Sequence, residues 1–532
     1  MLDVVITGAQ IIDGTGRPAF PADLGIQGDR IVMVGDAQDV PAVERIDADG
    51  LIATPGLIDP HSHSDWSVLG NPEAVSTIRQ GVTTEVVGNC GVTYAPLAEA
   101  GIAPASAALG AFGFDEPVAW RSFDELLEEV HGRGTSQNLS WFVGQTALRQ
   151  AAESRSEESR NSLAAEQEHL LHEAMEAGAI GFSSGLEYGA GRFSTADELT
   201  ELARIAARYD GIYASHIRNR DSALDAAVDE FFAIARAAGR AQLSHLNVRH
   251  NTGADEGAWH RAADRVVDER ASGLDILADM TPYNQGIGFA VGLLPRFVAD
   301  NEPARIARLL RDPDVQLGVR EDSDRYWRFV HRGEWQRVRL GVAPATPELE
   351  GLSFPEIAGR LGTDEWGAFF EVLAAAGEEV GSVQLLGDLF TDEHLRDAIA
   401  HDHFLLGVDA YTSRTDGPLA ERTRHPLFFY GHTHFLAHHV ARRRTLTLEE
   451  AVRKMTSAVA DHFGLTGRGR VRPGAFADLV LFDPARLAII DTTVVPRGYA
   501  DAARDVWVNG VRVVRDASHT GARPGRHLRR AG

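Results

Sequence analysis

Cysteine and lysine are almost absent from this chain of 532 residues, because each occurs once, as Cys90 and Lys454. A single cysteine excludes an intrachain disulfide, which fits a reducing compartment, and we therefore expect a cytoplasmic protein. Residues 1–5 carry no basic stretch, so no secretory signal is expected. No run of about 18 apolar residues occurs, so neither a transmembrane helix nor a membrane partner is expected.

Positive charge is also scarce, since 52 lysine and arginine residues face 76 aspartate and glutamate residues and leave a net charge of −24. Proteins that bind nucleic acid need a basic surface, so no nucleic-acid partner is expected. Hydrophobic residues make up 44% of the chain, which is enough for a large core. The length is too great for one small domain and accommodates a barrel with additional elements.

The stretch from residue 55 to residue 65, PGLIDPHSHSD, is the most informative part of the sequence. It follows the apolar residues 51–53 and contains His61 and His63, one residue apart. Side chains alternate along a strand, so a strand ending in this pair points both imidazoles to the same side. Two such imidazoles can bind one metal ion, whereas the alternative is a pair of polar residues in a loop. The apolar strand and the Pro-Gly turn favour the metal.

Both ends of the chain have the pattern of an all-β unit. Short β-type segments separated by glycines occur at residues 3–35 and again at residues 474–514, with turns about every ten residues. We predict that residues 1–55 and 468–532 form one small β-sandwich domain. Residues 56–467 then form the catalytic domain.

The middle of the chain alternates apolar strands with amphipathic segments, such as 196–209 and 223–239. Eight segments have the pattern of buried strands: 51–63, 83–90, 140–144, 179–186, 211–217, 241–246, 274–283 and 403–410. Eight strands with helical crossovers predict an α/β fold, a (β/α)8 TIM-like barrel. Active sites of such barrels lie at the carboxyl ends of the strands.

Six side chains of the kinds that bind metals stand at the carboxyl ends of five of these predicted strands: His61, His63, Cys90, His216, His245 and Asp409. Each one by itself has an ordinary structural explanation. A lone histidine is usually a hydrogen-bonded structural residue, and a lone cysteine is a small buried hydrophobe. Six of them at the ends of five strands are not explained in that way. The sequence therefore predicts a metal centre at this edge of the barrel, in which Asp409 is also the candidate catalytic residue.

Several motifs carry a resemblance to a known family. Besides residues 55–65, they are Gly-Asn-Cys-Gly at 88–91, Ser-Ser-Gly-Leu-Glu-Tyr at 183–188, Ser-His-Ile-Arg at 215–218, Gln-Leu-Ser-His at 242–245 and Asp-Met-Thr-Pro-Tyr at 279–283. On these motifs the chain resembles the amidohydrolase superfamily and, within it, the N-acyl-D-amino-acid deacylase (D-aminoacylase) family. The resemblance covers nearly the whole chain, and Gly-Asn-Cys-Gly is its most family-specific part.

The resemblance implies a metal site without lysine. Many amidohydrolases bridge two metals with a carbamylated lysine, but Lys454 lies in a predicted helix after the last strand, and the resemblance implies that Cys90 takes this role. It implies one tightly bound ion on Cys90, His216 and His245. His61, His63 and Asp409 would form a second position that is weaker or empty. Sulfur and nitrogen ligands together favour zinc.

The chemistry expected of such a site is amide hydrolysis by a metal-activated water. Zinc lowers the pKa of bound water towards neutrality. Asp409 would take the proton as general base and later give it to the leaving nitrogen. Tyr188 is a candidate hydrogen-bond donor to the oxyanion, and the alternative is that it packs as an ordinary aromatic residue.

The residues expected to hold the substrate depart from the family pattern. The family usually has a lysine two positions after the strand-six histidine and an arginine in His-Pro-Arg, where this chain has Asn247 and Leu427. The candidates for contact with the substrate are Arg218, Arg249, Arg414, Arg424, Asn247 and Tyr283. The alternative is that the substrate lacks a free carboxylate at this point, and the sequence leaves both readings open.

A long connection separates the seventh and eighth strands, from residue 284 to residue 402. Plain connections are far shorter. The family resemblance implies an inserted lid over the mouth of the barrel, which we place at about 285–350. The alternative is a peripheral helical insertion without contact to the substrate.

Three functions are compatible with these features. The leading prediction is a zinc amidase that removes the acyl group from N-acyl-D-amino acids or related small amides. The second is a cyclic amide hydrolase like a hydantoinase or dihydroorotase. The third is a non-catalytic barrel scaffold, against which the complete set of ligand residues argues. The expected partner is a small-molecule amide substrate, and self-association into a homo-oligomer is left open.

Overall fold

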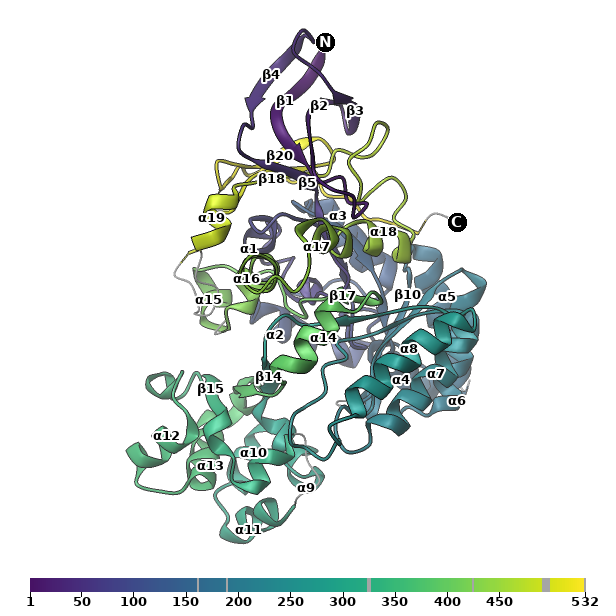
Figure 1. The fold of residues 1–532 in the computed structure, drawn as a ribbon. Coiled ribbons are helices and arrows are strands. Elements are labelled where there is room, and N and C mark those ends of the chain that lie inside the picture. The colour runs from purple at the N-terminus through teal and green to yellow at the C-terminus, as the bar shows by residue number, and fades with distance from the viewer. Residues whose placement is uncertain (160–161, 188–189, 323–326, 423–424, 490–497, 531–532) are drawn as a thin grey trace.

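The computed structural model describes residues 1–159, 162–187, 190–322, 327–422, 425–489 and 498–530. Figure 1 shows three regions along the molecule. Strands from both chain ends lie at one end, and helices and short strands from residues 285–389 lie at the other, with parallel strands and their helices between them. None of the described helices is long and apolar enough to cross a membrane.

The strands of the two chain ends pair with each other in one sheet. In the described residues its strands are β1 (Leu2–Ile11), β2 (Phe20–Gln27), β3 (Arg30–Gly35), β4 (Ala42–Asp47), β5 (Ile52–Pro55), β18 (Leu479–Phe482), β19 (Ala503–Val508), β20 (Val511–Arg515) and β21 (Ser518–His519). The order is β21-β20-β19-β18-β5-β1-β2-β3, with β4 beside β1, so the two ends meet where β18 runs antiparallel to β5. The sandwich form of this sheet and its boundaries, 1–55 and 468–532, stay a prediction.

Short parallel strands make up the middle of the molecule. They are β6 (Leu57–Asp59), β7 (Val82–Val87), β8 (Asn138–Trp141), β9 (Val143–Gly144), β10 (Gly181–Gly185), β11 (Ile212–His216), β12 (Arg240–Leu243), β13 (Asp275–Met280) and β17 (Phe404–Leu406). One sheet has the order β6-β7-β8 and the other the order β17-β13-β12-β11-β10-β9, with parallel pairing throughout. Their residues are almost all buried, which is typical of parallel sheets covered on both faces. The predicted α/β class is confirmed.

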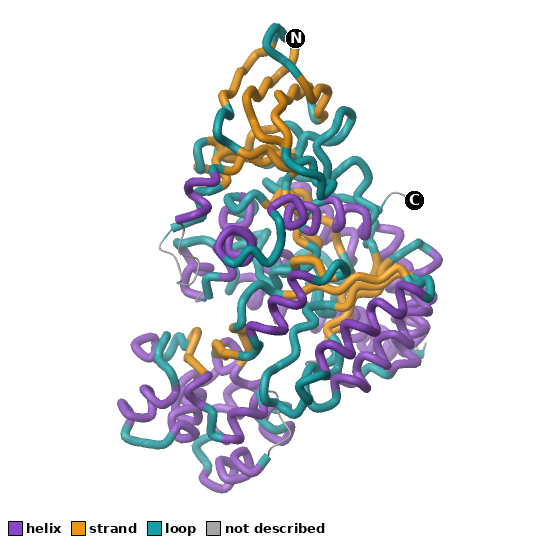
Figure 2. The backbone as a smooth tube through the Cα atoms, in the orientation of Figure 1, coloured by secondary structure: helices purple, strands orange, loops and turns teal. Residues whose placement is uncertain are grey.

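Helices follow most of these strands. Those that pack around the parallel strands are α1 (Val75–Ile78), α2 (Glu99–Gly110), α3 (Phe123–Arg133), α4 (Gln145–Ser159), α5 (Leu163–Ala177), α6 (Ala196–Arg208), α7 (Leu224–Ala238), α8 (Ala258–Ala271), α14 (Asp392–Ala400), α15 (Gly417–Arg422), α16 (Leu427–His434), the π-helical η8 (Phe435–Arg442), α17 (Leu448–Lys454), α18 (Ser457–Phe463) and α19 (Pro484–Ile489). α6 begins after Thr195, whose hydroxyl accepts the amide of Glu198. Figure 2 shows α4 to α8 lined up beside the orange strands.

The loops that follow β6 and β17 lie side by side. The amide of Asp409 donates to the carbonyl of His61 at 2.9 Å, and the amide of His63 donates to the carbonyl of Ala410 at 2.7 Å. Ser62 and Ala410 form a parallel bridge. The first and the last of the predicted strands are therefore linked at their carboxyl ends.

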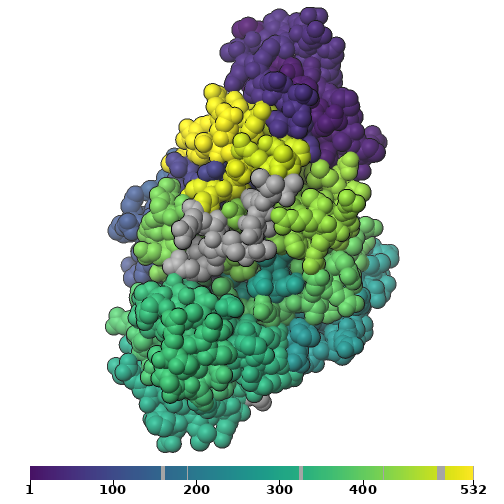
Figure 3. Space-filling model, turned by 60° about the vertical axis from the view of Figure 1, so that its left-hand side comes forward, coloured from purple at the N-terminus to yellow at the C-terminus, as the bar shows by residue number. Residues whose placement is uncertain are grey.

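The connection between β13 and β17 forms a body of its own. Its elements are β14 (Gln285–Phe289), α9 (Arg296–Ala299), α10 (Pro303–Leu309), α11 (Pro313–Glu321), β15 (Val338–Val342), α12 (Phe354–Leu361), α13 (Glu365–Ala376) and β16 (Gln384–Asp388). The strands form an antiparallel sheet in the order β14-β16-β15, and a separate hydrophobic core runs from Ala290 to Leu389. The inserted body thus extends beyond residue 350, where we expected the lid to end. Figure 3 shows it as the teal-green lobe opposite the purple N-terminal strands.

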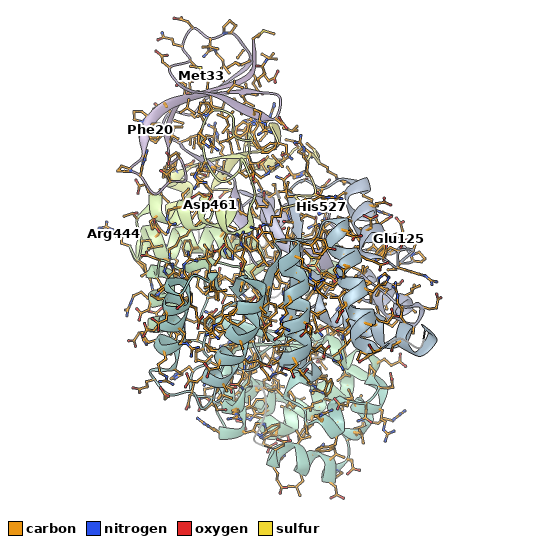
Figure 4. All side chains as sticks on the ribbon, turned by 90° about the vertical axis from the view of Figure 1, so that its right-hand side faces the viewer. Phe20, Met33, Glu125, Arg444, Asp461 and His527 are labelled. Carbon is orange, nitrogen blue, oxygen red and sulfur yellow. The ribbon has the colours of Figure 1, made fainter. Side chains whose placement is uncertain are left out.

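The C-terminal tail runs back along the parallel strands. The amide of Leu139 in β8 donates to the carbonyl of Arg526 at 3.0 Å, and the amide of Leu528 donates to the carbonyl of Leu139 at 2.8 Å. The ring of His527 stacks on His131 of α3, with a centroid distance of 5.2 Å. Figure 4 labels His527 close to the helices, below the end sheet that carries Phe20 and Met33. The tail therefore ties the end sheet to the middle of the molecule.

Candidate metal centre

Side chains that bind metals gather at the carboxyl ends of the parallel strands. His61 follows β6, Cys90 follows β7, His245 follows β12 and Asp409 follows β17. One ligand atom from each of the four lies within 4.8 Å of those of the other three. Parallel strands end at a common edge, which is why residues so far apart in sequence meet here. His61, Cys90 and His245 are buried, whereas the side chain of Asp409 is 30% exposed, so the group opens to solvent on the Asp409 side.

The donor atoms of this group face one another. Cys90 Sγ lies 3.3 Å from Nε2 of His61 and 3.4 Å from Nε2 of His245. Asp409 Oδ1 lies 3.5 Å from Nε2 of His61 and 3.1 Å from Nε2 of His63. Both imidazoles of the His-x-His pair therefore reach the same carboxylate, as the alternation along a strand predicts.

The backbone at three members of the group has an uncommon conformation. The φ angle is +55° at Cys90, +33° at His245 and +57° at Asp409. Residues other than glycine seldom adopt positive φ, and such conformations concentrate at functional sites. The flanking Gly91 also has positive φ, and a Cβ there would lie 2.6 Å from the amide nitrogen of Gly185. The Gly-Asn-Cys-Gly motif thus fits a close approach to β10.

Asp279 contacts two histidines of this group. Its Oδ1 lies 3.2 Å from Nδ1 of His61 and accepts the amide of His245 at 2.8 Å. Its other oxygen accepts from Gln242 Nε2 at 2.6 Å. A carboxylate on Nδ1 fixes the proton there and leaves Nε2 for the side that faces Cys90. The sequence motif contained Asp279 but gave it no role; a carboxylate inside the buried strand β13 was the signal.

His216 lies next to the group and is paired with Glu187. Its ring centroid is 4.5 Å from that of His245, and its Nε2 is 2.8 Å from Oε2 of Glu187. Glu187 also accepts from both terminal nitrogens of the buried Arg249, at 2.6 Å for Nη1. Burial alone would raise the pKa of the Glu187 carboxyl, but Arg249 and His216 hold it well below its usual range. Sequence reasoning gave Glu187 no role, although it stands inside a family motif.

Electrostatics favour the ligand forms of Cys90, His245 and Asp409. Burial would raise the pKa of the Cys90 thiol, but the imidazoles of His61 and His245 hold it well below its usual range, so the thiolate is favoured. Burial, with Arg220 nearby, lowers the pKa of His245 to about 4 and keeps its imidazole neutral. Burial would raise the pKa of Asp409, but His245 and His63 hold it well below the usual value. A thiolate, neutral imidazole and carboxylate are the forms in which these residues bind metal.

The imidazoles of His61 and His63 have raised pKa values instead. Burial would lower the pKa values of both, but Asp279 and Cys90 raise the pKa of His61 well above its usual range. Asp409 and Cys90 raise the pKa of His63 to about 10. Metal binding at these two imidazoles therefore has to displace a proton.

The residues predicted to contact the substrate do not form one group as the metal-binding side chains do. Arg218 is paired with Glu230 at 2.9 Å and donates to backbone carbonyls, and Arg414 is paired with Asp416 at 3.0 Å. Asn247 is buried, and its side-chain oxygen accepts the amide of Thr281 at 3.1 Å. Three candidates remain, of which the structure describes one. Tyr283 stacks on His434 at 3.9 Å, whereas Tyr188 and Arg424 lie outside the described residues.

Lys454 lies at the other end of the last parallel strand. It is buried at the end of α17, and Nζ donates to the carbonyls of Ile399 at 2.9 Å and Phe404 at 3.2 Å, and to that of His401. Phe404 begins β17, whereas Asp409 follows its carboxyl end. The Lys454 amine therefore binds at the amino end of β17, opposite the end that leads to Asp409.

Buried imidazoles, a thiol and a carboxylate at the carboxyl ends of parallel strands are the arrangement typical of metal-dependent hydrolases. The model of the amidohydrolase family matches residues 44–324 and 361–514. The chain belongs to this family, and it is a hydrolytic enzyme. Part of the inserted body, residues 325–360, lies outside the match.

Relatives of known activity resemble the whole chain. An N-acyl-D-glutamate deacylase from Alcaligenes xylosoxydans xylosoxydans is 33% identical over 99% of this chain and 97% of its own. The crystal structure of an N-acyl-D-glutamate deacylase from Bordetella bronchiseptica, in complex with zinc and a phosphonate inhibitor that mimics the tetrahedral intermediate, has a TM-score of 0.80 at 30% identity, with 99% of both chains covered. The resemblance to the deacylase family is confirmed.

Two further structures bear on the metal and on the alternative function. A D-aminoacylase studied for its binuclear metal centre, with one-metal activation and second-metal attenuation, has a TM-score of 0.77 at 28% identity over the full length of both chains. An L-hydantoinase from Arthrobacter aurescens has a TM-score of 0.56 at 15% identity, again over both full chains. The hydantoinase shares the fold alone.

Proposed function

We propose that this chain is a zinc-dependent deacylase that hydrolyses the amide bond of N-acyl-D-amino acids or related small amides. The observation that carries the proposal is the convergence of Cys90, His61, His245 and Asp409 within 4.8 Å at the carboxyl ends of parallel strands. The full-length similarity to N-acyl-D-amino-acid deacylases supports the substrate class.

The architecture proposed for this activity is a closed (β/α)8 barrel. Its strand order would be β6, β7, β8 with β9, β10, β11, β12, β13 and β17, with β17 next to β6. The parallel bridge between Ser62 and Ala410 supports this closure. The inserted body with its own core would be the lid, and the sheet of the chain ends would form the sandwich domain.

The donor set fits zinc. Cys90 supplies a thiolate and the histidines supply neutral imidazoles, which are the ligands that zinc prefers in proteins. We assign Cys90, His216 and His245 to the tightly bound ion and His61, His63 and Asp409 to a second, weaker position. The contacts of Cys90 Sγ to Nε2 of both His61 and His245 support a thiolate between the two sets. When bound, zinc supplies an activated water and polarises the scissile carbonyl.

The chain's own residues would position and move the protons. Asp409 is partly exposed and lies 3.1 Å from Nε2 of His63, a position from which it could accept a proton from water and return it to the leaving nitrogen. Asp279 and Glu187 hold the ring nitrogens of His61 and His216, which fixes the directions in which these imidazoles point.

A hydrolysis screen of the zinc-loaded enzyme tests the proposal. The library contains N-acetyl-D-amino acids, their L enantiomers, and cyclic ureides such as hydantoins. We expect turnover of acyclic D substrates that depends on metal and is lost after chelation. Turnover of the cyclic compounds only would establish the alternative of a cyclic amide hydrolase, and no turnover of any amide by zinc-loaded protein would contradict both.

A further inference from the structure

One buried arginine beside the metal centre lacks an acidic partner. Arg220 lies in the loop between β11 and α7, and only 7% of its surface is exposed. Its Nη1 donates to Nδ1 of His245 at 3.0 Å and to the carbonyl of His245 at 3.1 Å. Nε is buried and has no hydrogen-bond partner. In the part of the chain that the structure describes, no carboxylate forms an ion pair with Arg220.

Two other buried arginines show what such a side chain normally requires. Arg249 is paired with Glu187 and Asp221, and Arg468 is paired with Asp478 and bonds to Asn509 at 2.8 Å. A buried charge without a counter-charge is strongly unfavourable, so buried arginines are normally paired. Arg220 departs from this rule. It therefore has the charge and the unused donors to bind an anion that the chain itself does not supply.

We propose that Arg220 binds the α-carboxylate of the substrate and replaces the cationic anchors that this chain lacks. The proposal rests on the proposed deacylase function, since it names the residue by which the enzyme would hold its N-acyl amino acid. Arg220 stands in no motif to which the sequence assigned a role. Its unpartnered Nε, together with Nη2, forms one edge of the guanidinium, and this edge matches the two oxygens of a carboxylate.

The position of Arg220 fits the length of the substrate. Nε2 of His245 faces Cys90 at 3.4 Å, and Nδ1 of the same ring faces Arg220 at 3.0 Å. One imidazole ring therefore separates the guanidinium from the metal ligands. In an N-acyl amino acid, only the nitrogen and Cα separate the scissile carbonyl from the carboxylate. A carboxylate held by Arg220 would thus leave the scissile carbonyl near the ligand group.

The alternatives for this role that the structure describes are bound to other groups of the chain. Arg218 and Arg414 are paired with Glu230 and Asp416. Asn247, which stands where the family usually has lysine, is two residues from His245 and accepts a backbone amide. The Arg220 guanidinium contacts the carbonyl of His245, so its charge lies close to the position from which the lysine charge is missing.

The tautomer that His245 needs for metal binding also supports a carboxylate at Arg220. In the present arrangement Nδ1 accepts a hydrogen bond from Arg220. An imidazole that binds a metal through Nε2 carries its proton on Nδ1, and this N–H cannot accept from a guanidinium. Nη1 keeps its hydrogen bond to the carbonyl of His245, and its second N–H, which no longer finds an acceptor on the ring, becomes available to the substrate carboxylate.

The test compares a carboxylate substrate with its neutral counterpart. Wild type, Arg220→Met, Arg220→Lys and the control Arg414→Met are assayed on N-acetyl-D-leucine, N-acetyl-D-glutamate and N-acetyl-D-leucinamide, with bound zinc measured in each. For Arg220→Met we expect kcat/KM to fall by about ten- to a hundredfold on both acids, mainly through KM, because a hydrogen bond to a charged group is lost. The carboxamide should be hydrolysed at the wild-type rate, Arg220→Lys should recover part of the loss, and Arg414→Met should behave as wild type.

Several outcomes would overturn the assignment. Equal losses on acids and carboxamide would give Arg220 a structural role at His245, and a loss on N-acetyl-D-glutamate alone would mean that it binds the distal carboxylate. A wild type that prefers the carboxamide would exclude a carboxylate anchor. Calorimetric binding of N-acetyl-D-leucine separates the two proposals. If wild type binds it and Arg220→Met does not, Arg220 is the anchor even where no hydrolysis occurs. Equal binding by both proteins contradicts the assignment.

Discussion

In the part of the chain that the structure describes, two groups that contain histidines bring their ligand atoms within 4.8 Å of one another, and they are built differently. One contains His61 and His245, together with Cys90 and Asp409, at the ends of four parallel strands. The other contains His434, His438 and His439, which come from one continuous helical stretch, α16 and η8. The π-helical turn brings these three rings to one side of the helix.

The orientation of the rings separates the two groups. His434 and His438 stack with an interplanar angle of 12° and a centroid distance of 4.7 Å. Nitrogen lone pairs lie in the ring plane, so those of two stacked rings run parallel and do not converge on one ion. In the strand-end group, by contrast, Nε2 of His61 and of His245 both point at Cys90 Sγ. Convergence of lone pairs, rather than proximity alone, therefore distinguishes a metal centre.

The surroundings differ as well. Asp279 holds His61, and three members of the strand-end group have positive φ angles. In the helical group, His434 stacks on Tyr283, and His439 Nε2 donates to the carbonyl of Pro282 at 2.9 Å. The charged residues Asp392, Arg442 and Arg443 lie nearby. We infer that the helical group has a structural role, in which it packs against Tyr283, and that it binds no zinc.

The largest effect is expected from Cys90→Ala. It removes the thiolate that faces two imidazoles, so tight zinc and hydrolysis should be lost together. The matched variant in the helical group, His438→Ala, should keep one zinc per chain. Metal analysis of the purified proteins measures both. Cys90→Ala with one tightly bound zinc and near-normal turnover would contradict the assignment of the thiolate.

The next largest effect is expected from Asp409→Asn. The carboxylate is lost while Cys90 and the imidazoles remain, so tight zinc should stay bound. Turnover should fall by about two to four orders of magnitude, the usual contribution of a positioned acid or base. Steady-state rates and zinc content of the same sample test this. Loss of all zinc would instead make Asp409 a ligand of the tightly bound ion.

A smaller effect is expected from Asp279→Asn. It weakens the hydrogen bond that orients His61, and such supporting residues usually contribute about ten- to a hundredfold in metal affinity. Asp392, whose charge lies near His439 of the helical group, provides the control. Because His61 is assigned to the second, weaker zinc position, competition with a chelator should show weaker binding at that position in Asp279→Asn and wild-type binding in Asp392→Asn. Equal affinities in both variants would mean that Asp279 does not support the metal.

The smallest effect is expected from His438→Gln. This residue is half-buried, and its loss should change the free energy of unfolding by about 1 kcal/mol or less. Zinc content and kcat should not change. Denaturant unfolding and metal analysis check the two expectations. A loss of zinc in this variant would show that the helical group also binds metal, so that the two groups would not differ in this respect.

The sequence alone predicted those site residues whose side-chain direction follows from their position along a strand. His61 and His63 reach one carboxylate because side chains alternate, and Cys90 and His245 meet because parallel strands end together. Glu187, Asp279 and Arg220 could not be selected in the same way. Their roles depend on which side chain stands opposite, and that is set by the packing of distant strands.

Contacts between residues far apart in the sequence also explain why the end of the inserted body and the partners of two arginines were not predicted. The insert was expected to end near residue 350, but β16 lies in the middle of its sheet and comes after α13, so the core extends to Leu389. Arg218 and Arg414 are close to the site in sequence, yet each is paired with an acid. Sequence proximity does not reveal such a partner.

X-ray absorption at the zinc edge of the zinc-loaded enzyme tests the central claim most directly, because it reports the atoms bound to the ion. We predict one sulfur ligand at about 2.3 Å together with imidazole nitrogens at about 2.0 Å. Since Cys90 provides the chain's single thiol, that sulfur signal identifies the site by itself. A zinc shell of nitrogen and oxygen alone would contradict the metal centre described here.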